Sequence, residues 1–290
     1  MTTVAPASTR PSVPAGAAAP PVVHRRRRWT KAILPVYSWL VILYLVFPIA
    51  IMIVYSFNKV TGGLPLVSFA WNGATLRWYR QWSEISGLTS SFWLSIRLAL
   101  LATALASILG TLLALALVRY RPPRFRGKAG VEQVLFLNIA APEIVMGASL
   151  LGLFVTMNLA RGFLTLLVSH VMFCIAYVTV TVRARLAGFD QSLEEAAHDL
   201  GANPITTFRK VTLPLIMPGV LAGALMAFAL SIDDFVTSDF VSGQNLPFPV
   251  WVYSATRVGI PPQVFVFGTA IFTVGILCAL ASIVLSTRKT

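Results

Sequence analysis

Six long apolar stretches dominate the pattern of hydrophobic and polar positions along this chain. Each approaches or exceeds the ~20 consecutive apolar residues that cross the hydrocarbon core of a bilayer as a helix. Their approximate limits are Ala32–Tyr55, Leu98–Val118, Val134–Leu159, Phe163–Val182, Leu215–Ile232 and Val264–Leu285. The pattern predicts an all-α integral membrane protein with six transmembrane helices, in which residues 29–290 form one membrane domain.

The segment before the first stretch has a different composition. Residues 1–23 contain no acid and are rich in Ala and Pro, and Arg25–Arg28 follow. A segment with so few large apolar residues cannot bury a core, so residues 1–28 are predicted to be a disordered basic tail. The apolar stretch that follows has 24 residues, whereas the apolar region of a signal peptide has about 7–15. We therefore expect a retained first span.

Composition and charge support a membrane protein and give its orientation. Hydrophobic residues make up 57% of the chain and charged residues only 11%, against about 25% charged residues in soluble domains. This excludes a cytosolic enzyme. Of the Lys and Arg residues outside the spans, seventeen fall on the side of the N-terminus and five on the other. By the positive-inside rule both termini are cytoplasmic, and the net charge of +13 needs no nucleic-acid partner.

Between the fourth and fifth stretches, the pattern predicts a helical hairpin on the cytoplasmic side. Ser192 followed by Glu195 has the spacing of a capping box, and apolar residues then recur along one face. Gly201 suits the left-handed end of a first helix, and Asn203-Pro204 suits the start of a second. These local signals fit equally an ordinary interfacial hairpin, and they resemble those of a DNA-binding helix-turn-helix.

One motif separates these alternatives. Glu195-Ala196-Ala197, Gly201, Val211 and Leu213-Pro214 resemble the EAA signature of type I ABC-importer permeases, with Val211 where the signature has Ile. The resemblance covers about residues 30–290 and implies that the hairpin is the coupling helix that docks on an ATP-binding subunit. The coupling residues it implies are Glu194, Glu195, Ala196, Ala197, Asp199, Gly201, Leu213 and Pro214. The implied partners are a second permease subunit in a heterodimer, two ATP-binding subunits and an external solute-binding protein. The implied location is the bacterial cytoplasmic (inner) membrane.

The sequence carries no energy source of its own. It lacks the G-x-x-x-x-G-K-[ST] phosphate-binding loop, because Gly127-Lys128 is followed by Ala129. We therefore expect a transport subunit, not an enzyme, with ATP hydrolysed by a separate partner. No cofactor or metal site is expected, since His24, His170 and His198 are isolated from one another. His170 is interpreted as a hydrogen-bonding side chain between helices.

Three acids lie where a bilayer disfavours charge. Glu143 follows Pro142 near the middle of the third stretch, and Asp233 and Asp234 end the fifth. A charge at the bilayer centre costs about 2.5–3.5 kcal/mol on insertion scales. Pro142 predicts a break in the helix, and a broken helix with a carboxylate makes a polar site. The three acids are therefore candidates for a cation pathway. The alternatives are an ion pair of Glu143 with Arg97 and a solvated helix end at the aspartates.

Further segments narrow the resemblance. Ala141–Val145, Leu230–Val236 and Phe240–Gly243 are similar to the spermidine/putrescine permease subfamily, although Asp239 stands where a small or apolar residue is expected. The resemblance implies a polyamine as the solute. Alternatives are an importer for another solute such as ferric ion, a stand-alone secondary transporter, which should show internal repeats, and an integral-membrane enzyme, which should show a nucleophile or metal site.

Overall fold

The computed structural model describes residues 28–60, 70–119 and 127–287, without the side chains of 28–32, 86 and 278–287. The chain divides into two units, residues 1–51 and 52–290, and each is described by itself. The predicted tail lies outside the described residues except for Arg28. Among the described residues the regular structure is helical, apart from one isolated bridge between Asn58 and Ala74.

The described part of the first unit belongs to α1 (Arg28–Tyr55), which contains Pro35 and Pro48. Its section Ile33–Tyr55 is long and apolar enough to cross a membrane. Large apolar side chains are exposed along this helix, as expected of a helix surrounded by lipid. The first predicted span is therefore present as an apolar helix.

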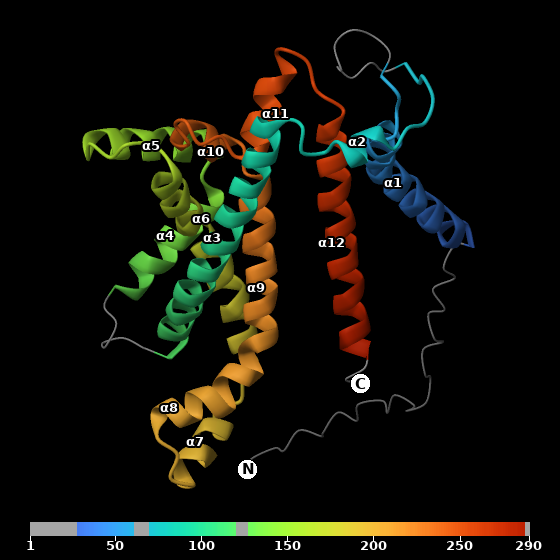
Figure 1. The fold of residues 1–290 in the computed structure, drawn as a ribbon. Coiled ribbons are helices and arrows are strands. Elements are labelled where there is room, and N and C mark those ends of the chain that lie inside the picture. Colours follow the sequence, from blue (N-terminus) through green and yellow to red (C-terminus); the bar gives the residue numbers. More distant parts are fainter. Residues whose placement is uncertain (1–27, 61–69, 120–126, 288–290) are drawn as a thin grey trace, which may run out of the picture. The chain divides into compact units, whose positions relative to one another are not determined.

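The core of the second unit is a bundle of three long helices, α3 (Ser86–Arg119), α6 (Phe163–Leu186) and α9 (Leu213–Asp233) (Figure 1). Their buried faces meet in one cluster: Ala106, Ala114, Leu115, Phe173, Cys174, Val178, Val182, Leu186, Ile216 and Ala227. Cys174 is thus a buried core residue, as its apolar surroundings in the sequence indicate. α3 begins well before Leu98, where the span was predicted to start. The prediction started late because the first turns of α3 carry Ser and Trp residues, which hydropathy alone does not assign to a span.

Small residues set the spacing between these helices at particular points. A Cβ atom added at Gly110 of α3 would lie 2.8 Å from Cβ of Val178 on α6. One added at Gly147 would lie 2.6 Å from the Phe240 ring, whereas at Gly152 it would meet nothing within 4 Å. Close packing therefore requires glycine at Gly110 and Gly147 and does not require it at Gly152.

The third predicted span is not a straight helix. α4 (Lys128–Ala140) and α5 (Glu143–Thr156) meet at an angle of 113°. The break falls at Ala141-Pro142, where proline lacks the N–H that would continue the helix. Sequence reasoning predicted the break but not its size, which turns α5 aside from α4 to pack on α10 (Val236–Val241).

Shorter helices complete the unit: α2 (Arg77–Arg80), α7 (Ser192–Asp199), α8 (Pro204–Thr207), the π-helix η1 (Phe208–Thr212), α10 and α11 (Phe248–Thr256). The last helix, α12 (Gln263–Thr287), is apolar along its described part to Leu277. Four helices in the described residues could cross a membrane, or five if α4 and α5 form one broken span. The full six-span topology remains a prediction.

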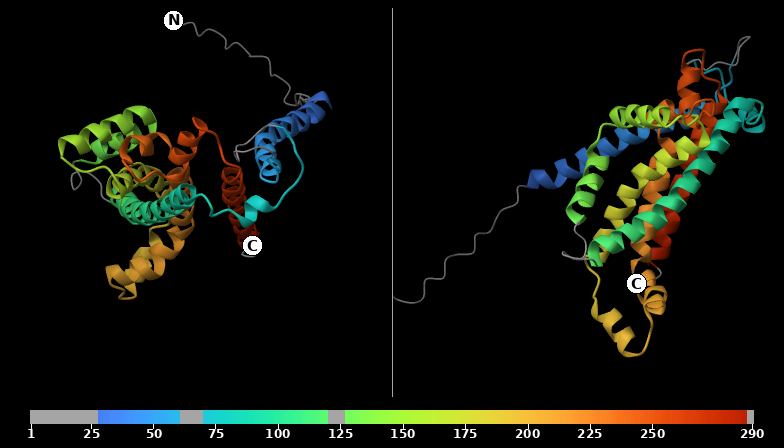
Figure 2. Two further views of the ribbon diagram at one scale, coloured as in Figure 1. Left: turned by 45° about the horizontal axis from the view of Figure 1, so that its top comes forward. Right: turned by 90° about the vertical axis from the view of Figure 1, so that its left-hand side faces the viewer.

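Figures 1 and 2 show the second unit with α7 and α8 at one end of the three-helix bundle and α5, α10 and α11 at the other. The two groups of predicted functional residues follow this division. The coupling residues lie at the end with α7 and α8, and the three acids lie at the end with α5 and α10.

Candidate functional site

The hairpin between α6 and α9 is built by local capping. Gly201 adopts φ +82°, the left-handed conformation that a helix end of this kind requires. Asn203 Oδ1 accepts a hydrogen bond from the Thr206 backbone N–H (2.8 Å), and Pro204 takes the first helical position. Both features of the predicted turn are therefore confirmed.

The start of α7 differs from the predicted capping box. Asp190 Oδ1, and not the side chain of Ser192, accepts the hydrogen bond at the helix start, from the Ser192 backbone N–H (3.0 Å). This bond lowers the pKa of Asp190 by stabilising its carboxylate. An Asx turn thus begins the helix in place of the box, and the Glu195 N–H, which the box would have capped, bonds instead to the Gln191 carbonyl (3.2 Å).

The second limb of the hairpin also differs from expectation. The sequence places Arg209 and Lys210 at the end of a short helix, where they would favour its dipole. In the structure α8, η1 and α9 follow one another without a break, so Pro204–Asp233 is one candidate span. The hairpin is therefore joined to the bundle by continuous helix on this side.

Most predicted coupling residues lie on the outer surface of the hairpin. Leu200 is 89% exposed, and Leu193 and Ile205, on either side of it in the sequence of the hairpin, are also exposed. Glu195, Ala196, Asp199, Gly201 and Pro214 are also exposed, while Ala197 and Leu213 are half-buried. The hairpin therefore presents three large apolar side chains to its surroundings.

Glu194 departs from this group. Its carboxylate accepts hydrogen bonds from Arg119 at the end of α3 and from the Thr212 hydroxyl at the end of η1. Sequence reasoning did not select Arg119 or Thr212, because nothing in the spacing along the chain links either residue to Glu194. The structure thus gives Glu194 partners within the protein itself.

At the opposite end of the bundle, Asp233 is exposed and lines a cavity of about 540 Å³. Phe235, Phe248 and Tyr253 form part of its wall, and Phe235 packs on Tyr253 with ring centroids 4.6 Å apart. The rest of the lining is largely aliphatic and comes mainly from α11 and α12, with Met52 and Ile232 added from α1 and α9. The cavity therefore offers one carboxylate within apolar and aromatic walls.

Asp234 has a different environment from its neighbour. Its Oδ2 accepts a hydrogen bond from the Ser238 backbone N–H (2.8 Å) and lies 3.5 Å from Nε2 of His170. His170 is fully buried and is also hydrogen-bonded to Ser231 Oγ (2.8 Å) and Ser238 Oγ (3.0 Å). His170 is therefore the interhelical hydrogen-bonding residue that the sequence indicated, and this network joins α6, α9 and α10.

Glu143 is exposed at the first position of α5. Glu143 and Asp234 lie close enough to Asp233 for their negative charges to repel its carboxylate. Glu143 is not part of the lining of the Asp233 cavity. The alternative pairing of Glu143 with Arg97 is not observed among the described residues.

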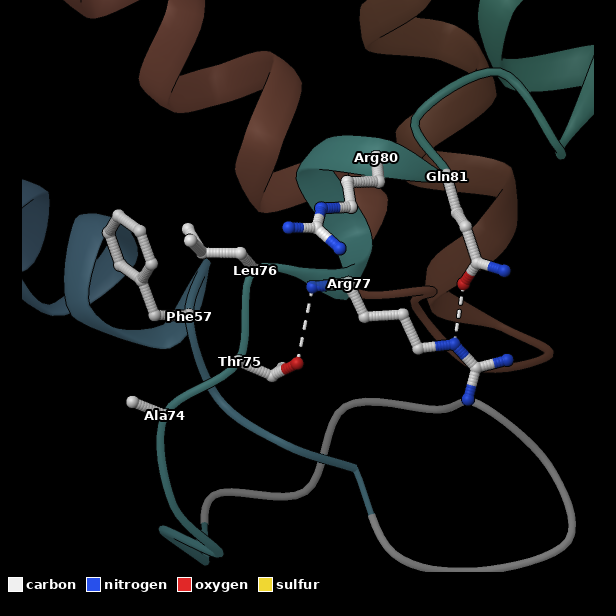
Figure 3. Close-up of a pocket in the computed structure, with 7 residues that line it drawn as sticks. All are labelled: Phe57, Ala74, Thr75, Leu76, Arg77, Arg80 and Gln81. Carbon is white, nitrogen blue, oxygen red and sulfur yellow. Dashed lines mark hydrogen bonds between the residues drawn. The ribbon is translucent and has the colours of Figure 1, made fainter.

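A larger cavity, about 700 Å³, lies beside α2 and has the opposite charge. Figure 3 shows the guanidinium groups of Arg77 and Arg80 among its lining, with Gln81 accepting a hydrogen bond from Arg77. Two positive charges repel an ammonium group. For a cationic solute, the cavity at Asp233 is therefore the better candidate despite its smaller volume.

Comparison with known proteins identifies relatives of this chain. Residues 131–290 match the family described as binding-protein-dependent transport system inner membrane component. The chain is 42% identical over 257 residues to the spermidine/putrescine transport system permease protein PotC of Haemophilus influenzae, covering 87% of this chain and 95% of that protein. It is 40% identical over 242 residues to the putrescine transport system permease protein PotI of Escherichia coli K12, covering 81% and 84%.

Solved structures agree at the level of the fold. A chain of a bacterial ABC transporter involved in the import of the acidic polysaccharide alginate superimposes with a TM-score of 0.65, covering 93% of this chain and 100% of that one. A chain of an amino acid ABC transporter crystallised with histidines gives 0.54, covering 74% and 100%. Both are 18% identical to this chain, so they support the architecture and give no information on the solute.

Proposed function

The chain belongs to the family of binding-protein-dependent transport system inner membrane components, and we propose that it is the permease subunit of an ATP-driven importer that carries polyamines across the bacterial cytoplasmic membrane. The observation that carries the proposal is the similarity to polyamine permeases over nearly their whole length. The membrane location follows the family and the apolar helices.

The chemistry of the Asp233 cavity supports a polyamine as the solute. Spermidine and putrescine are chains of methylene groups that carry ammonium groups at intervals. A carboxylate pairs with an ammonium, aromatic faces attract it through cation–π interaction, and aliphatic walls accommodate the methylene groups. Asp233 supplies the carboxylate, Phe235 and Tyr253 supply aromatic faces, and the aliphatic residues of the lining supply the third feature.

The other two acids take separate parts in the proposed pathway. Glu143 is exposed and increases the negative potential at Asp233, so it attracts a cation towards that end of the bundle. Asp234 is held by Ser238 and lies beside His170, so its contribution is to position the end of α9 next to the cavity. All three remain in the proposal, but only Asp233 lines the cavity.

The hairpin is the proposed docking element for an ATP-binding subunit. The exposed side chains of Leu193, Leu200 and Ile205 are its proposed apolar face, and Glu195 and Asp199, also exposed, add acidic groups to the hairpin. Two ATP-binding subunits, a second permease subunit and an external solute-binding protein complete the proposed importer. In this arrangement both termini and the hairpin are cytoplasmic, and the end with Asp233 faces outward.

Uptake of labelled spermidine in cells with and without this chain tests the function. We expect ATP-dependent uptake that is lost on deletion and competed by unlabelled putrescine, but not by ferric citrate or amino acids. Competition by ferric citrate would replace the polyamine with a metal solute. Uptake that survives deletion in cells without another polyamine system would contradict the proposal.

Docking is tested at the hairpin by Leu200→Glu. This change places a charge on the exposed apolar face, so the ATP-binding subunit should no longer copurify with the permease while the permease itself still folds. Val258→Glu is the matched control, because Val258 is 85% exposed and follows α11, at the other end of the bundle. Equal copurification of the two variants would show that the hairpin face is not the docking surface.

A further inference from the structure

Three side chains from separate elements meet where the hairpin joins the bundle, and they are called the latch here. Arg119 ends α3, Glu194 lies in the first turn of α7, and Thr212 ends η1. Arg119 Nη2 donates to Glu194 Oε1 and to Thr212 Oγ1, the second at 3.2 Å, and the Thr212 hydroxyl donates to Glu194. Each side chain therefore contacts both others.

The latch is partly buried. Thr212 is fully buried and the Glu194 side chain is 19% exposed, while the Arg119 side chain is 39% exposed. Partly buried charge pairs are screened less than exposed ones, and loss of one partner leaves the other charge without compensation. The Glu194 carboxylate faces inward, whereas Leu200 of the same hairpin is almost fully exposed. Glu194 is thus poorly placed to contact an incoming subunit.

The latch crosses a gap between the hairpin and the bundle. A cleft of about 240 Å³ separates α7 from the ends of α3 and α6, and its lining includes Val118, Leu186, Phe189 and Glu194. Within the described residues, α7 packs mainly on α8 and η1. The Arg119–Glu194 contact is therefore a direct polar link from α7 to α3 across this cleft.

The second limb of the hairpin reaches α9 through a π turn. In η1 the Leu213 backbone N–H bonds to the Phe208 carbonyl, five residues back. Such turns interrupt the regular α-helical ladder and occur often at functional positions. Thr212, the last residue of η1, is held by the latch, so this irregular turn and α7 are both tied to α3.

We propose that the latch transmits displacement of the hairpin to α3, so that Glu194 and Arg119 are positioning residues for coupling and do not form the contact with the ATP-binding subunit. The proposal rests on the function proposed above. With the latch intact, α3, α7 and η1 move together when the hairpin is pushed. Without it, the hairpin can still dock while its movement is no longer passed fully to α3.

The test uses the complete importer reconstituted in liposomes with its solute-binding protein. ATP hydrolysis and uptake of labelled spermidine are measured in the same vesicles, and their ratio is the readout. Thr212→Val keeps the shape of the side chain and removes its hydroxyl, whereas Thr212→Ser keeps the hydroxyl. Glu194→Ala removes the carboxylate, and Glu132→Ala removes a second ion pair, between Glu132 of α4 and Arg183 of α6 (2.9 Å), which includes no residue of the hairpin.

We expect Thr212→Val and Glu194→Ala to retain the ATP-binding subunit and hydrolysis, while uptake per ATP falls about fivefold or more, within the usual range of coupling between sites. Thr212→Ser and Glu132→Ala should keep the wild-type ratio. The double variant Arg119→Glu/Glu194→Arg restores an ion pair with the charges exchanged. It should recover part of the uptake per ATP that Glu194→Ala loses, and a change in expression alone would not produce this recovery.

Two results would overturn the latch. An unchanged ratio in Thr212→Val and Glu194→Ala would show that no movement passes through these side chains. Loss of the ATP-binding subunit from Glu194→Ala, in parallel with Leu200→Glu, would make Glu194 a docking residue. If wild-type vesicles hydrolysed ATP but took up no spermidine, the proposed solute and not the latch would be refuted. The latch would then be tested by comparing, between wild type and variants, how far the solute-binding protein stimulates ATP hydrolysis.

Discussion

At the scale of single residues, two consecutive aspartates at the end of α9 have distinct environments. Asp234 bonds to the Ser238 backbone N–H and lies near the buried His170 ring. Asp233 is exposed and lines the cavity with Phe235 and Tyr253. Consecutive residues of a helix point about 100° apart, and the backbone leaves the helical conformation only after φ of Asp234 (ψ 116°). Only Asp233 is therefore available to an ammonium group in this cavity.

Replacing Asp233 with Asn removes the charge and keeps the shape of the side chain. Because hydrogen bonds to charged groups are worth about 1.5–3 kcal/mol, the KM for spermidine uptake should rise about tenfold or more. Asp239→Asn is the control, since Asp239 is exposed on α10 and does not line the cavity. Equal KM values for the two variants in vesicle uptake would remove Asp233 from the pathway.

Gly201 gives a second prediction at this scale. An Ala at φ +82° costs about 1–2 kcal/mol in the left-handed conformation. A Cβ atom there meets nothing within 4 Å, so the backbone and not crowding would cause the effect. Gly201→Ala should reduce copurification of the ATP-binding subunit about fivefold or more, in line with that cost.

Two variants check the cause of that loss. Gly201→Asn should reduce copurification of the ATP-binding subunit less than Gly201→Ala does, because Asn tolerates the left-handed conformation. Gly188→Ala should leave copurification unchanged, since a Cβ atom at Gly188 meets nothing within 4 Å and its φ is not positive. If Gly188→Ala and Gly201→Ala behaved alike, the conformation of the turn would not matter for docking.

At the scale of elements, the contact between α3 and α6 is set by how closely their backbones approach. Gly110 faces Val178, and the Thr179 hydroxyl donates to the Gly110 carbonyl (3.3 Å) across the same contact. In a membrane, helices associate through such close packing and interhelical hydrogen bonds, because lipid removes the hydrophobic driving force between them. Side-chain volume at Gly110 therefore controls this contact.

Gly110→Ala should destabilise the bundle by about 1–3 kcal/mol, the usual cost of overpacking a well-packed core. The rigid Val178 side chain and a backbone carbonyl both crowd the added methyl group. Gly152→Ala is the matched control, because a Cβ atom there has open space. Thermal unfolding in detergent should separate the two variants, and equal midpoints would contradict the packing of α3 on α6.

At the scale of the whole molecule, the second unit places its two functional regions at opposite ends of one bundle. The hairpin of α7 and α8 lies beyond one end of α3, α6 and α9, while α10 and α11 lie at the other (Figure 2). These helices are long and apolar enough to cross a bilayer, so in the proposed topology the two regions face different compartments. Transport therefore requires that movement at the hairpin reach the opposite end through the bundle, for which the latch is the proposed first link.

Cysteine labelling in whole cells tests this orientation. Cys174 and Cys278 are first replaced by Ala, and a single cysteine is then introduced at Ile205 or at Val258, both of which are exposed. A membrane-impermeant thiol reagent added outside should label Val258→Cys and leave Ile205→Cys unlabelled until the membrane is permeabilised. The reverse pattern would invert the topology predicted from the Lys and Arg distribution.

Local properties of the chain determined much of this protein. The apolar stretches at residues 163–182 and 215–232 became α6 and α9, because the length of an apolar run decides whether it can span a bilayer. The turn at Gly201 and the cap at Asn203 also follow from neighbouring residues alone. The family resemblance rested on the same local motif and was supported by the comparison with known proteins.

Contacts between distant residues were decided only by the tertiary structure. Glu194 was grouped with the docking residues by its neighbours in the motif, yet it pairs with Arg119, 75 positions away. The bend at Pro142 was predictable, but its angle depends on the packing of α5 on α10. The periodicity of a sequence shows on which face of a helix each residue lies. The packing of the helices decides which faces meet, and therefore which charged side chains form ion pairs.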